Sequence, residues 1–108
     1  MTETLSTLRE VIDSRKDVAP SESYVAKMFD KGLNKVCQKV GEEATEVVIA
    51  ALAESKTDLV YESADLLFHL SILWAQKGVS PEDVMAELEK RMNSAKKGAA
   101  DGSNAYRP

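Results

Sequence analysis

The sequence is poor in the side chains that carry redox chemistry, because its 108 residues include only one cysteine and one histidine. The lone Cys37 cannot form a disulfide within the chain, and its place on a predicted helix indicates a buried structural thiol. The lone His69 stands four residues after Asp65, which does not match the E-x-x-H helices of a di-iron carboxylate site. We therefore expect His69 to be a structural hydrogen-bonding residue rather than a metal ligand.

The sequence also lacks a surplus of positive charge and a long apolar run. Its formal net charge is −4 at pH 7, which argues against non-specific binding to nucleic acid or to an anionic membrane. No apolar stretch approaches the roughly 20 residues that a membrane-spanning helix needs. The first residues, MTETLSTLRE, show no signal-peptide pattern. We expect a cytoplasmic protein with neither nucleic acid nor membrane as a partner.

Aromatic residues are scarce at 6%, although 44% of the residues are hydrophobic. This is enough apolar material for one small core, and a domain of this size often completes its burial in an oligomer. We predict a single domain at residues 1–97 that forms a homodimer or higher homo-oligomer. From residue 98 the sequence loses its periodicity and is rich in small residues, so a flexible tail is expected at residues 98–108.

Apolar residues recur at helical spacing along most of the chain, and no segment alternates convincingly with a period of two. Capping residues predict where helices start, at Ser21 or Ser23, at Ser55 or Thr57, and at Ser80. The expected helices cover residues 4–15, 24–31, 33–54, 58–77 and 81 to at least 92. The expected apolar face of the helix at 33–54 consists of Val36, Val40, Ala44, Val47, Val48 and Ala51. The sequence therefore predicts an all-α bundle, in which two long antiparallel helices and the shorter ones are completed by dimerisation.

Acidic residues form a pattern on each of the two long helices. Glu42, Glu43 and Glu46 lie in KVGEEATE, and Glu62 and Asp65 lie in YESADLLF. A spacing of three residues places two carboxylates side by side on one helix face. Burial of an uncompensated carboxylate costs several kcal/mol, whereas a small domain has only about 5–15 kcal/mol of stability. A divalent cation resolves this conflict, and Mg²⁺ suits carboxylate ligands, with Mn²⁺ as the alternative.

Acids and lysines on helices are more often solvated than functional. We interpret four other acids in that way: Glu54, Glu82, Glu87 and Glu89. Lys35 and Lys39 lie on the same stripe as the first acidic group, and Lys31 precedes that helix. For these lysines both a solvated face and contacts to phosphate oxygens remain open.

Two long stretches resemble a known family. They are SYVAKMFDKGLNKVCQKVGEEATEVVIAA and DLVYESADLLFHLSILWAQKGVSPEDVMAEL, which span residues 23–88. Both closely resemble the phosphoribosyl-ATP pyrophosphohydrolases of histidine biosynthesis, within the all-α nucleotide pyrophosphohydrolase (MazG-like) superfamily. The superfamily signature E-E-x-x-E followed by E-x-x-D matches residues 42–46 and 62–65. The K-G-x-x-K motif before K-V-G-E-E, and the aromatic-His-Leu triplet at residues 68–70, resemble the phosphoribosyl-ATP branch.

This resemblance implies a Mg²⁺-dependent hydrolase that splits the α–β phosphoanhydride of 1-(5-phosphoribosyl)-ATP, giving 1-(5-phosphoribosyl)-AMP and pyrophosphate. It implies that the metal ligands are Glu43, Glu46, Glu62 and Asp65. The implied catalytic set is Glu42, Glu43 and Glu46, with Glu42 as a ligand or as the group that orients the attacking water. Phosphate contacts are implied for Lys31, Lys35 and Lys39. The family's dimers would place the apolar segment at residues 66–74 in a subunit interface.

The resemblance does not extend to the end of the chain. The segment NSAKKGAADGSNAYRP departs from the S-G-x-x-E-K ending that is typical of many members. A stand-alone enzyme without a fused cyclohydrolase domain is expected. Two alternatives remain, namely a house-cleaning hydrolase of the same superfamily that acts on non-standard nucleoside triphosphates, and a non-enzymatic helical interaction module.

Overall fold

A computed structural model describes the backbone of residues 2–100 and the side chains of residues 2–95. Over this range the chain forms five α-helices and no strand, which confirms the all-α prediction. The helices are α1 (Thr2–Arg15), α2 (Tyr24–Lys31), α3 (Leu33–Ala53), α4 (Lys56–Gln76) and α5 (Pro81–Ala100).

Serine caps begin three of these helices, as the sequence predicts. The Ser23 side chain accepts a hydrogen bond from a backbone N–H in the first turn of α2. Ser55 and Asp58 form a reciprocal capping box at the start of α4. At the start of α5, Ser80 and Asp83 exchange the same pair of hydrogen bonds. Each cap satisfies backbone N–H groups that have no partner within the helix and contributes about 0.5–2 kcal/mol.

Glycines allow the turns that follow α2 and α4. Gly32 adopts φ +95° between α2 and α3, and Gly78 adopts φ +70° after α4. Residues with a Cβ rarely adopt a positive φ, so these two positions favour glycine. The predicted helix ends at both glycines are confirmed.

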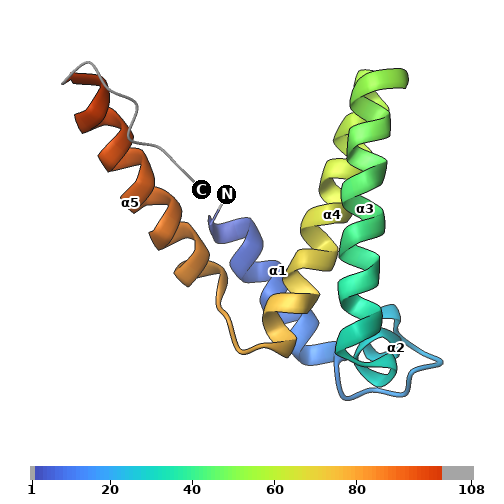
Figure 1. Ribbon diagram of the computed structural model, residues 1–108. Coiled ribbons are helices and arrows are strands. Elements are labelled where there is room, and N and C mark those ends of the chain that lie inside the picture. Colours follow the sequence, from blue (N-terminus) through green and yellow to red (C-terminus); the bar gives the residue numbers. More distant parts are fainter. Residues whose placement is uncertain (1, 101–108) are drawn as a thin grey trace.

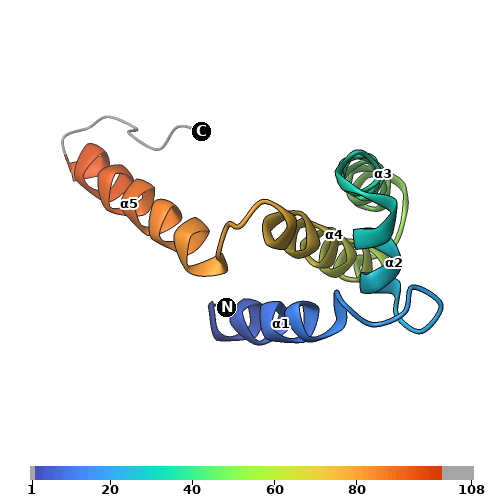
Figure 2. The same cartoon turned by 90° about the horizontal axis from the view of Figure 1, so that it is seen from below.

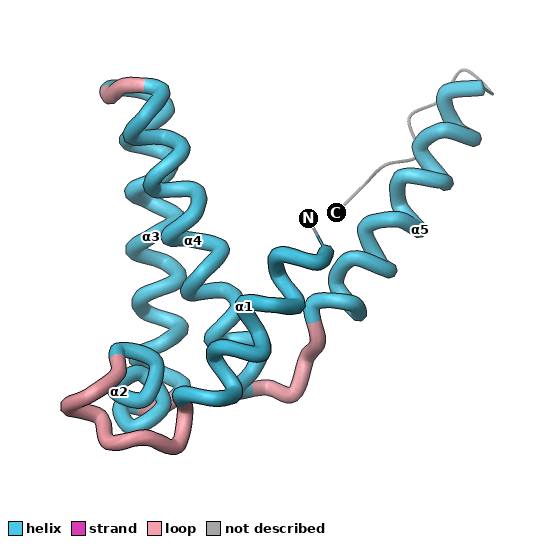
Figure 3. Tube along the Cα trace, turned by 180° about the vertical axis from the view of Figure 1, so that it is seen from behind, coloured by secondary structure: helices cyan, strands magenta, loops and turns pink. Residues whose placement is uncertain are grey.

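The helices form two diverging arms above a common base (Figure 1). The chain reverses direction after α3, and α3 and α4 lie side by side as one arm in Figures 1 and 3. We call this pair, residues 33–76, the α3–α4 hairpin. Helix α5 is the other arm and contacts α1 rather than α3. Seen from below, α1 runs beside α4 while α5 points away from the hairpin (Figure 2).

The core lies at the base, where the first four helices meet. Its buried members are Ile12, Val25, Met28, Val36 and Ile72. Partly buried side chains that pack on this core include Leu8, Phe29, Phe68 and Leu73. The segment at residues 66–74 is buried or half-buried within the single chain. The large apolar side chains that remain exposed on the hairpin are Leu33, Val48, Ile49, Leu52, Val60 and Tyr61.

The buried face of α3 differs from the predicted one. Its buried residues are Val36, Glu43 and Ala50, spaced by seven, whereas Val48 was expected on the apolar face and is exposed. The helix is therefore rotated so that Glu43 enters the seam with α4. The prediction of a buried Cys37 is wrong, because this residue is exposed. Consecutive residues on a helix point roughly 100° apart, so Cys37 turns away from the seam that Val36 occupies.

The helical region extends further than the sequence suggests. Helix α5 continues to Ala100 and so crosses the expected boundary between the domain at 1–97 and the tail at 98–108. The remainder of that expected tail, residues 101–108, lies outside the described residues. None of the helices described combines the length and the hydrophobicity that a membrane crossing requires.

Candidate active site

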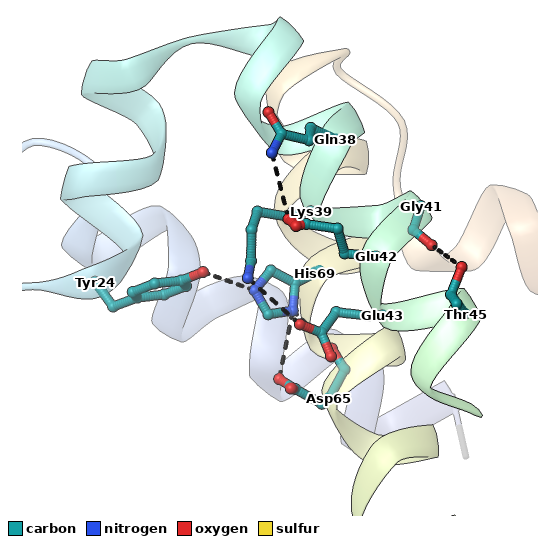
Figure 4. Close-up of polar contacts among 9 residues, drawn as sticks. All are labelled: Tyr24, Gln38, Lys39, Gly41, Glu42, Glu43, Thr45, Asp65 and His69. Carbon is teal, nitrogen blue, oxygen red and sulfur yellow. Dashed lines mark hydrogen bonds and ion pairs between the residues drawn. The ribbon is translucent and has the colours of Figure 1, made fainter. Parts of the chain in front are cut away.

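Three potential metal ligands meet in the seam of the α3–α4 hairpin. Glu43 comes from α3, and Asp65 and His69 come from α4 (Figure 4). One ligand atom of each lies within 4.8 Å of the others. Glu43 and His69 are buried and Asp65 is half-buried. The two helices therefore bring two carboxylates and an imidazole to one point.

The electrostatics around Glu43 reflect an excess of negative charge. Burial raises the pKa of the Glu43 carboxyl above its ordinary value, and a hydrogen bond with Asp65 and the charge of Asp65 raise it further. The Lys39 ammonium opposes these effects from one turn away, with its Nζ 3.5 Å from Glu43 Oε1. A cation placed between the carboxylates would favour the ionised form of Glu43.

The other two predicted ligands lie near the same carboxylates. Partial desolvation raises the pKa of Glu62, and the negative charges of Glu46, Glu43 and Asp65 raise it further. Glu62 is half-buried on α4, one turn before Asp65, and Glu46 is exposed on α3. Four acids from two helices thus share one electrostatic environment, which extends from the buried seam to the solvent.

The remaining residues predicted for the site lie around this cluster. Glu42 is exposed, and its Oε1 accepts a hydrogen bond from Gln38 Nε2 at 3.4 Å. Lys35 is half-buried one turn before Lys39, and Lys31 is exposed at the last residue of α2. Among these three lysines, Lys39 alone forms an ion pair with a site acid within the described part of the chain.

His69 makes hydrogen bonds through both of its ring nitrogens. Its Nδ1 lies 2.9 Å from the backbone oxygen of Asp65 and 3.4 Å from Asp65 Oδ1. Its Nε2 lies 2.8 Å from the hydroxyl of Tyr24. These contacts agree with the structural hydrogen-bonding role expected for the lone histidine.

Tyr24 is a site residue that the sequence reasoning did not identify. It is the first residue of α2, and its ring lies edge-on to the imidazole with centroids 5.6 Å apart. Burial raises the pKa of its hydroxyl; the charge of Lys39 lowers it, and the charges of Asp65, Glu43 and Glu42 raise it. The only signal in the sequence was that a buried histidine needs a partner, and nothing there pointed to a residue 45 positions away.

The donor set fits a hard divalent cation. Carboxylate oxygens from facing helices converge, and burial together with the negative charge of the neighbouring carboxylates raises the pKa of Glu43 and Glu62. Mg²⁺ prefers such oxygen ligands and commonly completes its coordination with water and substrate phosphates. The partly exposed rim near Glu46 and Glu62 leaves the cluster accessible from solvent.

A protein family and several curated relatives match this chain over most of its length. The family model described as phosphoribosyl-ATP pyrophosphohydrolase matches residues 5–92. A phosphoribosyl-ATP pyrophosphatase of Paramagnetospirillum magneticum is 53% identical over 91 residues, which cover 84% of each chain. A phosphoribosyl-ATP pyrophosphatase of Rhodospirillum rubrum is 50% identical over 93 residues, which cover 86% of this chain and 80% of that relative. A phosphoribosyl-ATP pyrophosphatase of Rhizorhabdus wittichii is 52% identical over 91 residues, which cover 84% of this chain and 86% of that relative. This chain belongs to the phosphoribosyl-ATP pyrophosphohydrolase family.

Proposed function

We propose that this protein hydrolyses 1-(5-phosphoribosyl)-ATP to 1-(5-phosphoribosyl)-AMP and pyrophosphate, the second step of histidine biosynthesis. One water molecule is consumed, the α–β phosphoanhydride breaks, and pyrophosphate leaves. Relatives that cover most of the chain are named for this activity, which favours an enzyme over an interaction module. The structural observation that carries the proposal is the meeting of Glu43 and Asp65 in the hairpin seam, beside Lys39.

Mg²⁺ is the cofactor that we propose, with Mn²⁺ as the alternative. Glu43 and Glu46 from α3 and Glu62 and Asp65 from α4 would hold it. When bound, such an ion neutralises phosphate charge and activates a water molecule for attack. The protein's own contribution is to keep these carboxylates ionised and fixed across two helices.

The residues around the cluster have proposed roles in binding and orientation. Glu42 lies at the exposed rim next to Glu43, where its carboxylate can accept a hydrogen bond from the attacking water and orient it. Lys31, Lys35 and Lys39 would donate charge-assisted hydrogen bonds to phosphate oxygens. The ion pair between Lys39 and Glu43 supports this role for Lys39.

We further propose that the antiparallel hairpin is completed by a second copy of the chain, in the cytoplasm. Leu52 is 83% exposed, and Val60 and Tyr61 are 64% and 68% exposed. Several large, exposed apolar side chains on one arm of a small domain favour an interaction surface there. Helix α5 diverges from the hairpin and leaves this arm uncovered (Figures 1 and 3).

A substrate panel tests the proposed function. Purified protein is assayed for pyrophosphate release from phosphoribosyl-ATP, ATP, dUTP and dCTP, with Mg²⁺ and with EDTA as the control. Phosphoribosyl-ATP should be hydrolysed far faster than the others, and only with the metal. Faster turnover of dUTP or dCTP would instead identify a house-cleaning hydrolase, and no turnover of any compound would identify a non-enzymatic module.

A further inference from the structure

We propose that Tyr24 is a positioning residue of the site, which acts through His69 to hold the Asp65 carboxylate opposite Glu43. This inference rests on the function proposed above. Helix α2 carries none of the proposed acidic ligands. It would nevertheless support the site, because the Tyr24 hydroxyl reaches from α2 to the imidazole on α4 (Figure 4).

The hydrogen bonds determine where the proton of His69 lies. The backbone oxygen of Asp65 can only accept, so the Nδ1 that lies 2.9 Å away must carry the hydrogen. In a neutral imidazole Nε2 is then an acceptor, and the hydroxyl of Tyr24, 2.8 Å away, must donate to it. Burial and the nearby acids outweigh Lys39 and raise the pKa of Tyr24, which keeps this hydroxyl protonated at neutral pH.

Aromatic packing restricts rotation of the imidazole. His69 is only 3% exposed. Tyr24 meets the ring edge-on at 86°, and Phe68 meets it at 84° with centroids 5.3 Å apart. Tyr24 and Phe68 also lie against each other, with centroids 6.0 Å apart. The Tyr24 hydroxyl therefore adds a directional bond to a ring whose position is already confined.

His69 also contacts the side chain of Asp65. The same Nδ1 lies 3.4 Å from Asp65 Oδ1, so the imidazole contacts both the backbone and the carboxylate of this residue. If His69 bound a metal through Nδ1, this nitrogen would lose its proton and both of its contacts with Asp65. Groups that orient metal ligands typically change metal affinity about 10- to 100-fold when they are removed. We expect an effect in this range for the hydroxyl of Tyr24.

The first test reads the imidazole directly. His69 is the only histidine of the chain, so its ring ¹⁵N signals in an NMR spectrum are unambiguous. Metal-free wild-type protein, recorded at a pH high enough for the imidazole to be neutral, should show a protonated Nδ1 and an unprotonated Nε2. Tyr24→Phe should shift the population toward protonation at Nε2, whereas Thr7→Val, which removes an exposed hydroxyl on α1, should not. A wild-type ring that is protonated mainly at Nε2 overturns the proposal without any variant.

The second test measures Mn²⁺ affinity by electron paramagnetic resonance. Tyr24→Phe should weaken binding about tenfold with an unchanged circular dichroism spectrum, and the control Thr7→Val should bind as wild type does. In a His69→Asn background, Tyr24→Phe should have no further effect, because Tyr24 acts through the imidazole. A Tyr24→Phe protein within about two-fold of wild-type affinity contradicts the proposal. If the wild-type protein hydrolyses no substrate but gives the expected tautomer and the expected Mn²⁺ affinities, the proposed function is wrong and the positioning role of Tyr24 stands.

Discussion

Lys39 Nζ lies 3.5 Å from Oε1 of Glu43, one turn further along α3. The pair stands where Glu43 also faces Asp65, so a single ammonium offsets a cluster of acids. It does not offset them fully, because the pKa of Glu43 remains raised by burial and by Asp65 in spite of Lys39. Burial and the Asp65 carboxylate therefore disfavour the ionised form of Glu43, which a divalent cation would stabilise.

The first prediction concerns stability against pH without divalent cations. Glu43 binds a proton more readily in the folded state than in the unfolded state, since its folded pKa is raised. Its contribution to the free energy of unfolding is fully present below the unfolded pKa of about 4.3 and is lost as pH rises through the folded pKa. In EDTA, Glu43→Gln should be more stable than wild type at pH 7, and this advantage should vanish toward pH 4.

Urea unfolding at a series of pH values measures this difference. Glu89→Gln, an exposed change on α5, serves as the control and should follow wild type closely. A Glu43→Gln protein whose advantage grows as the pH falls would mean that Glu43 is stabilised as the carboxylate by Lys39. That result would remove the argument for electrostatic repulsion in the seam.

The second prediction concerns the proposed ligands on the two helices. Glu46→Gln and Asp65→Asn each remove one carboxylate from the cluster and should abolish hydrolysis while leaving the helical circular dichroism intact. Mg²⁺ should raise the melting temperature of wild type, because a ligand that binds only the folded state stabilises it, and this rise should be lost in both variants. Retention of more than about a tenth of wild-type turnover by both would contradict the ligand assignment.

Local sequence signals were sufficient for the helices. Ser23, Ser55 and Ser80 begin helices because their side chains satisfy nearby backbone N–H groups, and these are short-range effects. These short-range signals did not predict which face of α3 is buried. Apolar residues suggested a face that includes Val48, whereas the structure buries Glu43. Apolar periodicity did not place Glu43 in the seam, because it assigns every acidic residue to the solvent-exposed face of a helix.

The candidate site was predictable in its acids and not in its supporting contacts. The spacing of Glu43, Glu62 and Asp65 on two helices is a repeated local pattern, and these residues lie in one electrostatic environment. The bond between Tyr24 and His69 depends on how α2 docks on the hairpin. Docking of this kind is a tertiary property, so a sequence without spatial information leaves it open.

The third prediction concerns assembly. The exposed apolar side chains of the hairpin, among them Leu52 and Val60, should be covered by a second copy, so light scattering should give a dimer or larger species at micromolar concentration. Leu52→Lys places a charge in this proposed interface and should shift the protein toward monomers. Ser21→Lys makes the same change of charge in an exposed turn and should leave the mass unchanged. A well-folded wild-type monomer at this concentration would rule out the proposed dimer.

The last prediction decides between the two interpretations of Lys39. Burial lowers the pKa of the Lys39 ammonium, whereas the negative charges of Glu42 and Glu43 raise it, and the pKa lies above its ordinary value, so Lys39 is charged at neutral pH. If Lys39 binds phosphate oxygens, Lys39→Ala removes a charge-assisted hydrogen bond worth about 1.5–3 kcal/mol, which is roughly ten- to a hundred-fold in kcat/KM. A loss mainly in kcat would mean that Lys39 stabilises the negative charge that develops on the leaving pyrophosphate. A loss mainly in KM would mean that Lys39 contributes to binding of the substrate before the reaction.

Lys90→Ala, an exposed change on α5, is the matched control and should leave kcat/KM unchanged. A Lys39→Ala enzyme within about two-fold of wild type in kcat/KM would leave this lysine as a counter-charge for Glu43 only.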